Sequence, residues 1–428
     1  MMNTRFKRFA LALLMQGIFV LSPLALAQSS GLAEFAEPTL PANAVAVLSQ
    51  TPAYQAALQG IAAERSVHRQ LRTGAQEWTG TLSTAQRTQT RPTREQTSEW
   101  ELLLERNLRL AGKADAYDRV GSSRVEQARA LRHKVWREQA RLLLDSQGGW
   151  LRAQESARVW ALQVALLSRQ VEAVSKRQKL GDAARIEQQL AEAALAQAQA
   201  QAQAADSRAG AARESLALHF PGLLLAAMQQ LPPPQALPDS DAQWLALQED
   251  HSPELDLARS DSAAAQAQMR LESAETRPDP RVGVRVGRAV SGAENVVGVV
   301  FSMPFGGEHR SAAAAAAVSR AEATVLRQAD AQRRSQADAT QRLREARTAY
   351  TFWLGNADAA QRLAQAADGL QRGYQLGEGS LSDVLSARRL ANEQQLAAAL
   401  GAVDAWQSRH RLELESRLLW AEPDQLAE

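Results

Sequence analysis

The stretch between Ala111 and Leu180 contains no proline, and its apolar residues recur at the spacing of an α-helix. These apolar positions are Leu142, Leu143, Trp150, Val159, Trp160, Val164 and Leu167. At a rise of about 1.5 Å per residue, one helix over this stretch would be roughly 100 Å long. A compact domain has no room for such a helix, so the sequence predicts an elongated molecule that bridges a distance.

A sharp turn is predicted to end this helix, and a similar turn occurs again later in the chain. Residues 178–193 are QKLGDAARIEQQLAEA, and residues 375–390 are QLGEGSLSDVLSARRL. Three matched pairs keep one offset of 196 residues, namely Gly181 and Gly377, Glu187 and Asp383, and Ala191 and Ala387. Constant offsets over such a distance indicate a tandem duplication. Each half is predicted to contain a helix, a β-hairpin, a long helix, a turn and a returning helix.

Two segments alternate in the way that β-strands do, at about residues 76–109 and 280–305. In the first, one face holds Trp78, Gly80, Leu82 and Thr84, followed on the next strand by Trp100, Leu102, Leu104 and Arg106. In the second, Val282, Val284 and Val286, and then Val297, Val299, Phe301 and Met303, alternate with polar or small residues. One apolar face over about nine residues is typical of transmembrane barrel strands. An amphipathic hairpin on a soluble sheet is the alternative interpretation.

If these strands lie in a membrane, the four strands of one chain cannot form a closed barrel on their own. Four strands do not close a barrel, and an open strand edge in lipid leaves backbone groups without hydrogen-bond partners. Three chains would together supply twelve strands, an even number of the kind found in outer-membrane barrels. The long helices would then be pooled as well, and would form a helical tube next to the barrel.

The first 27 residues are predicted to be a signal peptide. Arg5, Lys7 and Arg8 precede an apolar run at residues 9–21, and Ala25-Leu26-Ala27 fits the cleavage rule, although a retained membrane anchor is the alternative. Residues 28–220 are then the first repeat, 221–252 a proline-rich linker and 253–428 the second repeat. Removing the signal changes the formal net charge from +2 to −1, which gives no reason to expect nucleic-acid binding.

With this layout, the chain resembles the TolC-type outer-membrane factors, the exit ducts of tripartite efflux and secretion systems. The resemblance is carried by the duplicated layout, by SMPFGGEHRSAAAAAAVSRAEA at the end of the last strand, and by QLGEGSLSDVLSARRL. It implies a mainly α-helical homotrimer with a twelve-stranded β-barrel in the outer membrane and an α-helical barrel in the periplasm. It also implies a periplasmic adaptor and an inner-membrane pump as partners. The phrases HSPELDLARSDSAAAQAQ and RPDPRVGVRVGR resemble the heavy-metal cation branch, which implies metal cations as the substrate.

The same resemblance implies where the functional residues lie. The helical-hairpin turns would be the periplasmic tips that dock the adaptor, at Leu180 and Gly181 in the first repeat and at Leu376, Gly377, Gly379 and Ser380 in the second. Tyr374 and Asp383 match positions that help to close the aperture. Gly379 replaces the basic partner of some relatives, which leaves Arg185, Arg372 or Arg388 as candidate substitutes. Trp78 and Trp100 are candidates for membrane-interface anchors, with ordinary packing as the alternative.

The sequence shows no motif for catalysis, metal binding or cofactor binding. It has no cysteine, so it has neither disulfides nor thiolate metal sites. Its six histidines include no pair at helical spacing, which predicts no metal site, and the Gly306-Gly307 pair lacks the rest of a phosphate-binding motif. We therefore expect a passive channel without cofactors and without enzymatic activity. The alternative is a periplasmic coiled-coil adaptor or scaffold, which would place one helical hairpin between compact β domains.

Overall fold

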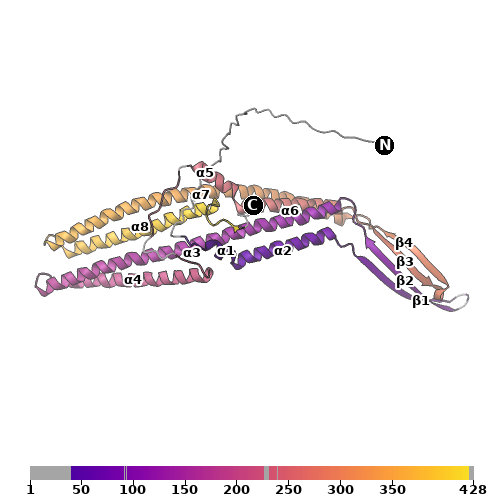
Figure 1. The fold of residues 1–428 in the computed structure, drawn as a ribbon, viewed down its shortest axis with the longest axis horizontal. Coiled ribbons are helices and arrows are strands. Elements are labelled where there is room, and N and C mark those ends of the chain that lie inside the picture. The colour runs from indigo at the N-terminus through magenta and orange to yellow at the C-terminus, as the bar shows by residue number, and fades with distance from the viewer. Residues whose placement is uncertain (1–39, 91, 93, 226–230, 239, 424–428) are drawn as a thin grey trace, which may run out of the picture.

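The computed structural model describes residues 40–90, 92, 94–225, 231–238 and 240–423. The predicted signal peptide at residues 1–27 lies outside the described residues. The helices run along one long axis, and the strands lie together at one end of it (Figure 1). The predicted fold class, long antiparallel helices with four strands per chain, is confirmed.

Two long helices, each followed by a shorter one, form the body of the molecule. The helices of the first half are α1 (Ala44–Ser49), α2 (Pro52–Thr73), α3 (Lys113–Lys179) and α4 (Arg185–His219); those of the second half are α5 (Asp241–Asp250), α6 (Pro253–Glu275), α7 (Glu308–Gln375) and α8 (Leu381–Glu415). Helix α3 has 67 residues and α7 has 68, and α4 and α8 have 35 residues each. At about 1.5 Å per residue, α3 and α7 are each roughly 100 Å long. The order of the helices matches between the two halves, as do the lengths of α3 and α7 and of α4 and α8.

Helix α5 lies within the segment that the proline pattern predicts to be a linker. Its N-cap is Ser240, whose side chain accepts a hydrogen bond from the backbone N–H of Gln243 at 3.3 Å. Helix α6 begins in the same way, because Ser252 accepts from the N–H of Leu255 at 3.3 Å. Serine caps satisfy backbone donors that the first helical turn leaves unpaired. These local caps therefore start two helices within a proline-rich part of the chain.

The two hairpins combine into one antiparallel sheet. Strands β1 (Trp78–Gln89), β2 (Glu95–Asn107), β3 (Arg281–Ala289) and β4 (Glu294–Ser302) lie in the order β1-β2-β3-β4. The central pairing joins β2 to β3, for example Leu104 to Val284, and thereby unites the two halves of the chain. Within the described chain, β1 and β4 are the edges of this sheet.

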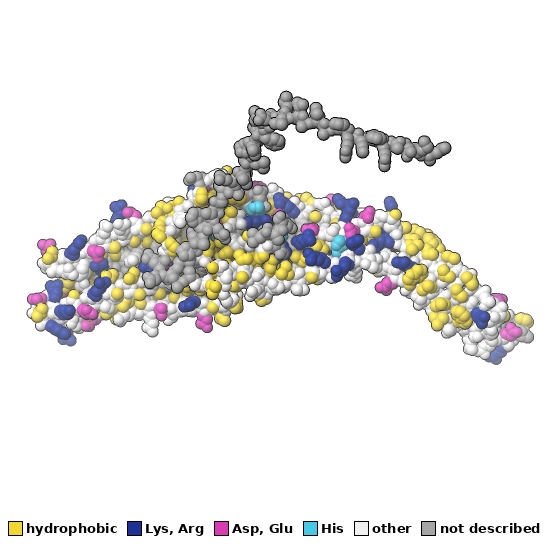
Figure 2. Space-filling model, in the orientation of Figure 1, with side chains coloured by type: hydrophobic (Ala, Val, Ile, Leu, Met, Phe, Trp, Pro, Cys, Tyr) yellow, Lys and Arg dark blue, Asp and Glu magenta, His cyan; other side chains and the backbone are white. Residues whose placement is uncertain are grey.

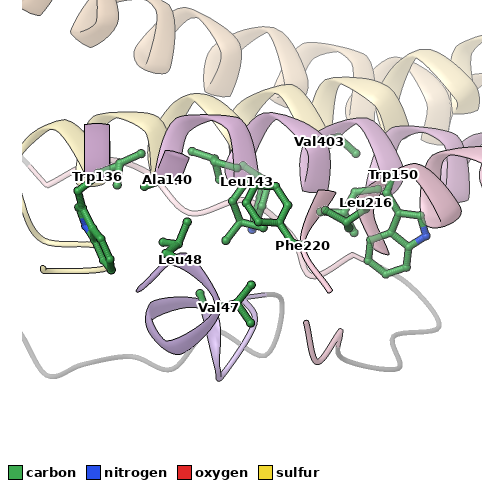
Figure 3. Close-up of a cluster of buried hydrophobic side chains, with 14 of the residues drawn as sticks. Val47, Leu48, Trp136, Ala140, Leu143, Trp150, Leu216, Phe220 and Val403 are labelled. Carbon is green, nitrogen blue, oxygen red and sulfur yellow. The ribbon is translucent and has the colours of Figure 1, made fainter. Parts of the chain in front are cut away.

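The main hydrophobic core lies near the middle of the long axis, where α1 packs against α3, α4 and α8 (Figure 3). Its labelled side chains are Val47, Leu48, Trp136, Ala140, Leu143, Trp150, Leu216, Phe220 and Val403. No helix in the described ranges combines the length and the apolar character needed to cross a membrane.

A buried ion pair between α3 and α8 accompanies this core. Arg141 donates from Nε and Nη2 to the two carboxylate oxygens of Glu415, at 2.6 and 2.7 Å. Glu415 is only 4% exposed. Burial alone would raise the pKa of Glu415, but the hydrogen bonds and charge of Arg141 outweigh burial and hold that pKa below its usual range. The pair therefore keeps a charged carboxylate inside the helical bundle.

Candidate functional site: the hairpin tips and the sheet

The turn between α3 and α4 and the turn between α7 and α8 lie at the same end of the molecule, far from the strands (Figure 1). We call residues 176–187 tip 1 and residues 372–383 tip 2. In tip 1 the N–H of Asp182 donates to the carbonyl of Arg177 at 2.9 Å, and in tip 2 the N–H of Glu378 donates to that of Gly373 at 2.9 Å. This is the Schellman arrangement, which needs a left-handed residue after the helix cap. Gly181 and Gly377 supply it, with φ of 87° and 86°.

A leucine lies at the apex of each tip. Leu180 is 77% exposed and Leu376 is 80% exposed, so both side chains project from the end of the helical hairpins. Large apolar side chains at the end of a rigid element are typical of contact surfaces. The two tips thus present the same kind of apolar contact.

The helix that returns from tip 2 has a side-chain cap that tip 1 lacks. Ser380 accepts a hydrogen bond from the N–H of Asp383 at 3.2 Å and donates its hydroxyl to the carboxylate of Asp383 at 2.8 Å. In tip 1 the corresponding N-cap is Ala184, which has no side chain able to accept a bond. The carboxylate of Asp383 is therefore engaged with its own helix N-terminus, where the helix dipole also favours a negative charge.

One hydrogen bond joins the two tips directly. The hydroxyl of Tyr374 donates to Oε2 of Glu187 at 2.7 Å, and we call this bond the tip link. The guanidinium of Arg177 lies over the ring of Tyr374, 4.7 Å from its centre. Burial, together with the hydrogen bond and charge of Glu187, raises the pKa of Tyr374 to about 12. Tyr374 therefore stays protonated, and remains a donor, throughout the neutral range.

A small apolar cluster supports the tip link. Its members come from all four helices that meet at the tips, and Tyr374 belongs to it with an exposure of 5%. The buried members are Val174, Ala191, Tyr374, Leu381 and Val384, with Val171, Ala183 and Leu385 packed against them. This packing keeps water away from the ring and fixes the direction in which the hydroxyl points.

The residues that the resemblance assigns to the aperture are not gathered into one cluster in a single chain. Arg388 forms an ion pair with Asp368 at 2.7 Å, while Arg185 and Arg372 lie exposed on their tips. Among the described residues, none of these three arginines lies within ion-pair distance of Asp383.

Sequence reasoning did not single out Glu187 and Arg177 as functional residues. Glu187 lies at the 196-residue offset from Asp383, so the internal repeat could have identified Glu187 as a candidate. Arg177 is preceded and followed by other basic residues, and nothing in the sequence distinguishes it from them.

The sheet at the opposite end has two chemically different faces. Residues paired across the strands point to the same side, so Leu82, Leu102, Val286 and Val297 form one apolar row across all four strands. The next row holds Gly80, Leu104, Val284 and Val299. Hydrophobic side chains cover the sheet in Figure 2. Trp78 and Trp100 lie on the same face as these rows, 60% and 42% exposed, at opposite ends of the apolar band.

The other face of the sheet carries paired charges. Arg285 lies 3.8 Å from Glu101, and Arg281 lies 3.6 Å from Glu105. Along β2 the residues on this face are less exposed than those on the apolar face. A sheet with one exposed apolar face and one face of paired charges has the side-chain distribution of barrel strands that face lipid on one side and water on the other.

Several solved structures with the same architecture are outer-membrane proteins or channels. The outer membrane protein VceC of Vibrio cholerae has a TM-score of 0.68 and 16% identity, over 88% of this chain and 94% of that one. CusC, described in terms of transmembrane channel formation, has a TM-score of 0.66 and 13% identity, over 87% and 90% of the two chains. The outer-membrane channel OprN has a TM-score of 0.64 and 16% identity, over 88% and 89%. The chain therefore has the fold of the TolC-type outer-membrane factors that its sequence resembles.

No protein-family model matches the sequence, and no curated protein matches it. In the ranges that the structure describes, no group of three or more His, Cys, Asp or Glu side chains could hold a metal ion.

Proposed function

We propose that this chain is the outer-membrane exit duct of a tripartite efflux system, and that it conducts its substrate passively. The observation that carries the proposal is the sheet with an exposed apolar face, placed at one end of helices roughly 100 Å long. In water such a face would be an aggregation hazard, whereas in lipid it is the stable arrangement. The sheet would lie in the outer membrane, and most of the chain would lie in the periplasm.

The proposal requires several copies of the chain. Strands β1 and β4 are the edges of the described sheet, and an edge in the hydrocarbon core would leave N–H and C=O groups unsatisfied. Pairing β1 of one copy with β4 of the next satisfies both edges, and three copies close a ring of twelve strands. The helices of the three copies then surround one continuous tube.

At the far end of this tube, the tips would form a gate and a docking surface. The tip link holds tip 1 and tip 2 of one chain together. The apolar cluster beside it packs the four helices that meet at the tips against one another. Widening the aperture requires the hairpins to separate, and therefore requires the bond between Tyr374 and Glu187 to break. Leu180 and Leu376 face outward and are free to contact a periplasmic adaptor, beneath which the inner-membrane pump would lie.

Heavy-metal cations are the cargo that we propose from the sequence phrases at residues 251–268 and 277–288. A duct needs no ligands for its cargo, because the pump supplies both selectivity and energy. This part of the proposal is independent of the duct itself, and metal sensitivity of a deletion strain tests it separately.

The duct is tested by fractionation followed by gel migration without heating, and then by conductance in planar bilayers. We expect a heat-sensitive trimer in the outer-membrane fraction that forms channels when reconstituted. A soluble monomer without conductance would overturn the proposal and would favour the periplasmic adaptor or scaffold instead.

A further inference from the structure

A small cavity lies where the segment that follows α8 meets α3 and the start of α6. Its lining residues are His133, Trp136, Arg137, Pro253, Arg417, Leu419, Trp420, Ala421 and Glu422. The cavity has a volume of about 20 Å³, and a single water molecule needs roughly 10–15 Å³. It therefore has room for one particle of about the size of a water molecule, and it is too small for phosphate or a carboxylic acid.

A buried guanidinium in the wall of this cavity lacks a hydrogen-bond acceptor. Arg137 is 7% exposed, and its Nη1 has no acceptor within the described part of the chain. The carboxylate of Glu415 lies 4.0 Å from this atom, too far for a hydrogen bond, and both of its oxygens accept from Arg141. Burial lowers the pKa of Arg137 to about 10, so the group is still charged at neutral pH. A buried charge without a hydrogen-bonded partner is unfavourable, and a counter-ion would stabilise it.

A second guanidinium lines the same cavity. Arg417 lies 3.8 Å from the carboxylate of Asp256, beyond hydrogen-bond distance. The positive charge of Arg417 also disfavours the charged form of Arg137, which means that the two cations repel each other. An anion between them would replace this repulsion by attraction to both groups.

The acidic residue of the wall is already engaged by other groups. Glu422 accepts a hydrogen bond from the hydroxyl of Tyr54 at 2.9 Å, and its carboxylate also pairs with Arg132 at 2.9 Å and with His133. Because Arg132 balances its charge, Glu422 does not neutralise the two guanidinium groups of the wall.

The cavity belongs to one chain and not to a contact between chains. Helix α3 packs against α2 and against α6, and α6 packs in turn against α7, so α3 and α6 are inner helices of this part of the molecule (Figure 1). A neighbouring copy would be met through the outer helices. The burial of Arg137 is therefore produced by its own chain and does not depend on the number of copies.

We propose that this cavity binds one monatomic, monovalent anion of the chloride class between the guanidinium groups of Arg137 and Arg417. The anion accepts a hydrogen bond from the buried Nη1 of Arg137 and fastens the segment after α8, which carries Arg417, to α3. A water molecule would fit the same volume but would leave the repulsion between the two cations in place. The site is structural, and it goes beyond the proposed duct function.

The first test compares chloride with gluconate at constant ionic strength, using the purified protein in detergent. Amide hydrogen exchange measured by mass spectrometry reports the opening of residues 412–423. At chloride ten times the dissociation constant we expect exchange there to slow by about tenfold, because the ion must leave before the segment opens. Bromide should act as chloride does, whereas gluconate is too large for the cavity. Equal exchange in chloride and gluconate would overturn the inference.

Two variants assign the effect to the cavity. Arg417 is the left-handed residue after α8, with φ of 59°, so Arg417→Gly removes a guanidinium and places the favoured residue at that position. This variant should fold and should lose the response to chloride, as should Arg137→Gln. Arg409→Gln, which removes a cation that pairs with Glu413 outside the cavity, should keep the response. If Arg137→Gln does not fold, Arg417→Gly decides the test, and a full chloride response in Arg417→Gly would overturn the inference.

Crystals soaked in bromide give a direct readout. We expect an anomalous peak between Arg137 and Arg417 in the unaltered protein and none there in Arg417→Gly. A water molecule at this position in the bromide crystals would overturn the inference. A bromide peak without any effect of chloride on exchange would mark an adventitious ion only, and would overturn it equally. These outcomes leave the proposed function standing, because conductance and trimer formation are measured separately.

Discussion

Tyr374 and Glu187 come from opposite halves of the chain, and a 2.7 Å hydrogen bond joins them at the tips. Bonds to a charged acceptor are stronger than neutral ones, and this donor is almost fully buried. The bond therefore couples two helical hairpins at the end of the molecule opposite the strands. Several measurable consequences depend on it.

Tyr374→Phe removes the tip link but keeps the ring under Arg177. We expect the closed-state conductance in planar bilayers to rise, and the free energy of unfolding to fall by about 1–2 kcal/mol, since a part-buried hydrogen bond to a charged group is lost. Glu187→Gln should raise the conductance less, because an amide oxygen still accepts the hydrogen bond. Asp383→Ala tests the aperture role assigned by resemblance. Unchanged conductance in Tyr374→Phe would remove the tip link from the gate.

The tip link should not respond to pH in the neutral range. The pKa of Tyr374 is raised to about 12, above the value of 10.0 for an isolated tyrosine. A raised folded-state pKa means that the stabilisation is complete below pH 10 and is lost as the pH rises through about 12. Titration of tyrosines by NMR should show Tyr374 among the late-titrating groups, together with Tyr117, whose pKa is raised by burial and by Glu275. Only the pKa of Tyr374 should fall in Glu187→Gln. A Tyr374 signal that titrates near pH 10 would contradict the burial described here.

The cap of α8 gives a prediction with a matched control. Ser380→Ala should destabilise the protein by about 1 kcal/mol, because the N–H of Asp383 loses its acceptor. Ala184→Ser places the same cap on α4 and should stabilise tip 1 by a similar amount, since Ala184 already has extended backbone geometry. Limited proteolysis at each tip measures both effects.

Two neighbouring residues of β1 test the orientation of the sheet. Leu82 is 67% exposed on the apolar face, and Ser83 points to the polar face. Leu82→Arg should cost about 2–4 kcal/mol in lipid and reduce the amount of folded trimer, whereas Ser83→Arg should be tolerated. Equal yields of heat-sensitive trimer from the two variants would argue against lipid contact on the apolar face.

The buried pair of Arg141 and Glu415 predicts acid sensitivity. The lowered pKa of Glu415 means that its stabilisation is present above its usual value of 4.5 and is lost as the pH falls below it. Glu415→Ala should cost up to about 3–5 kcal/mol at neutral pH, because the buried Arg137 loses its carboxylate partner, although the part-exposed Arg141 keeps its pair with Glu254. Asp358→Asn, which breaks an exposed pair with Arg362, should cost less than about 1 kcal/mol. Thermal unfolding at pH 7 and at pH 4 distinguishes the two.

Local patterns were sufficient to predict most of the fold. Helix α3 ends at Lys179 and its left-handed residue is Gly181, because a long proline-free helix followed by Leu-Gly carries its own stop signal. The alternation of Val282, Val284 and Val286 likewise predicted a strand with one apolar face. In contrast, the pairing of β2 with β3 joins segments far apart in the sequence, and no local signal specifies it.

The tip link was beyond sequence reasoning for a similar reason. The resemblance points to Tyr374 and the internal repeat marks Glu187, but the two residues are 187 positions apart and no sequence pattern specifies that their side chains meet. Helix α5 was missed because the prolines around it outweighed the weaker signal of a serine cap. Contacts between hairpins depend on how whole helices pack, and single-residue patterns do not contain that information.

The open edges of the sheet determine how a mutant chain would affect normal chains in the same trimer. If three chains share one ring, a chain with a damaged β4 also leaves the β1 edge of its neighbour without a pairing strand. In a cell where half of the chains are damaged, only about one ring in eight would contain intact copies alone. A defect at an edge strand would therefore act dominantly, whereas a defect confined to one tip would leave the remaining tips of the same ring able to bind.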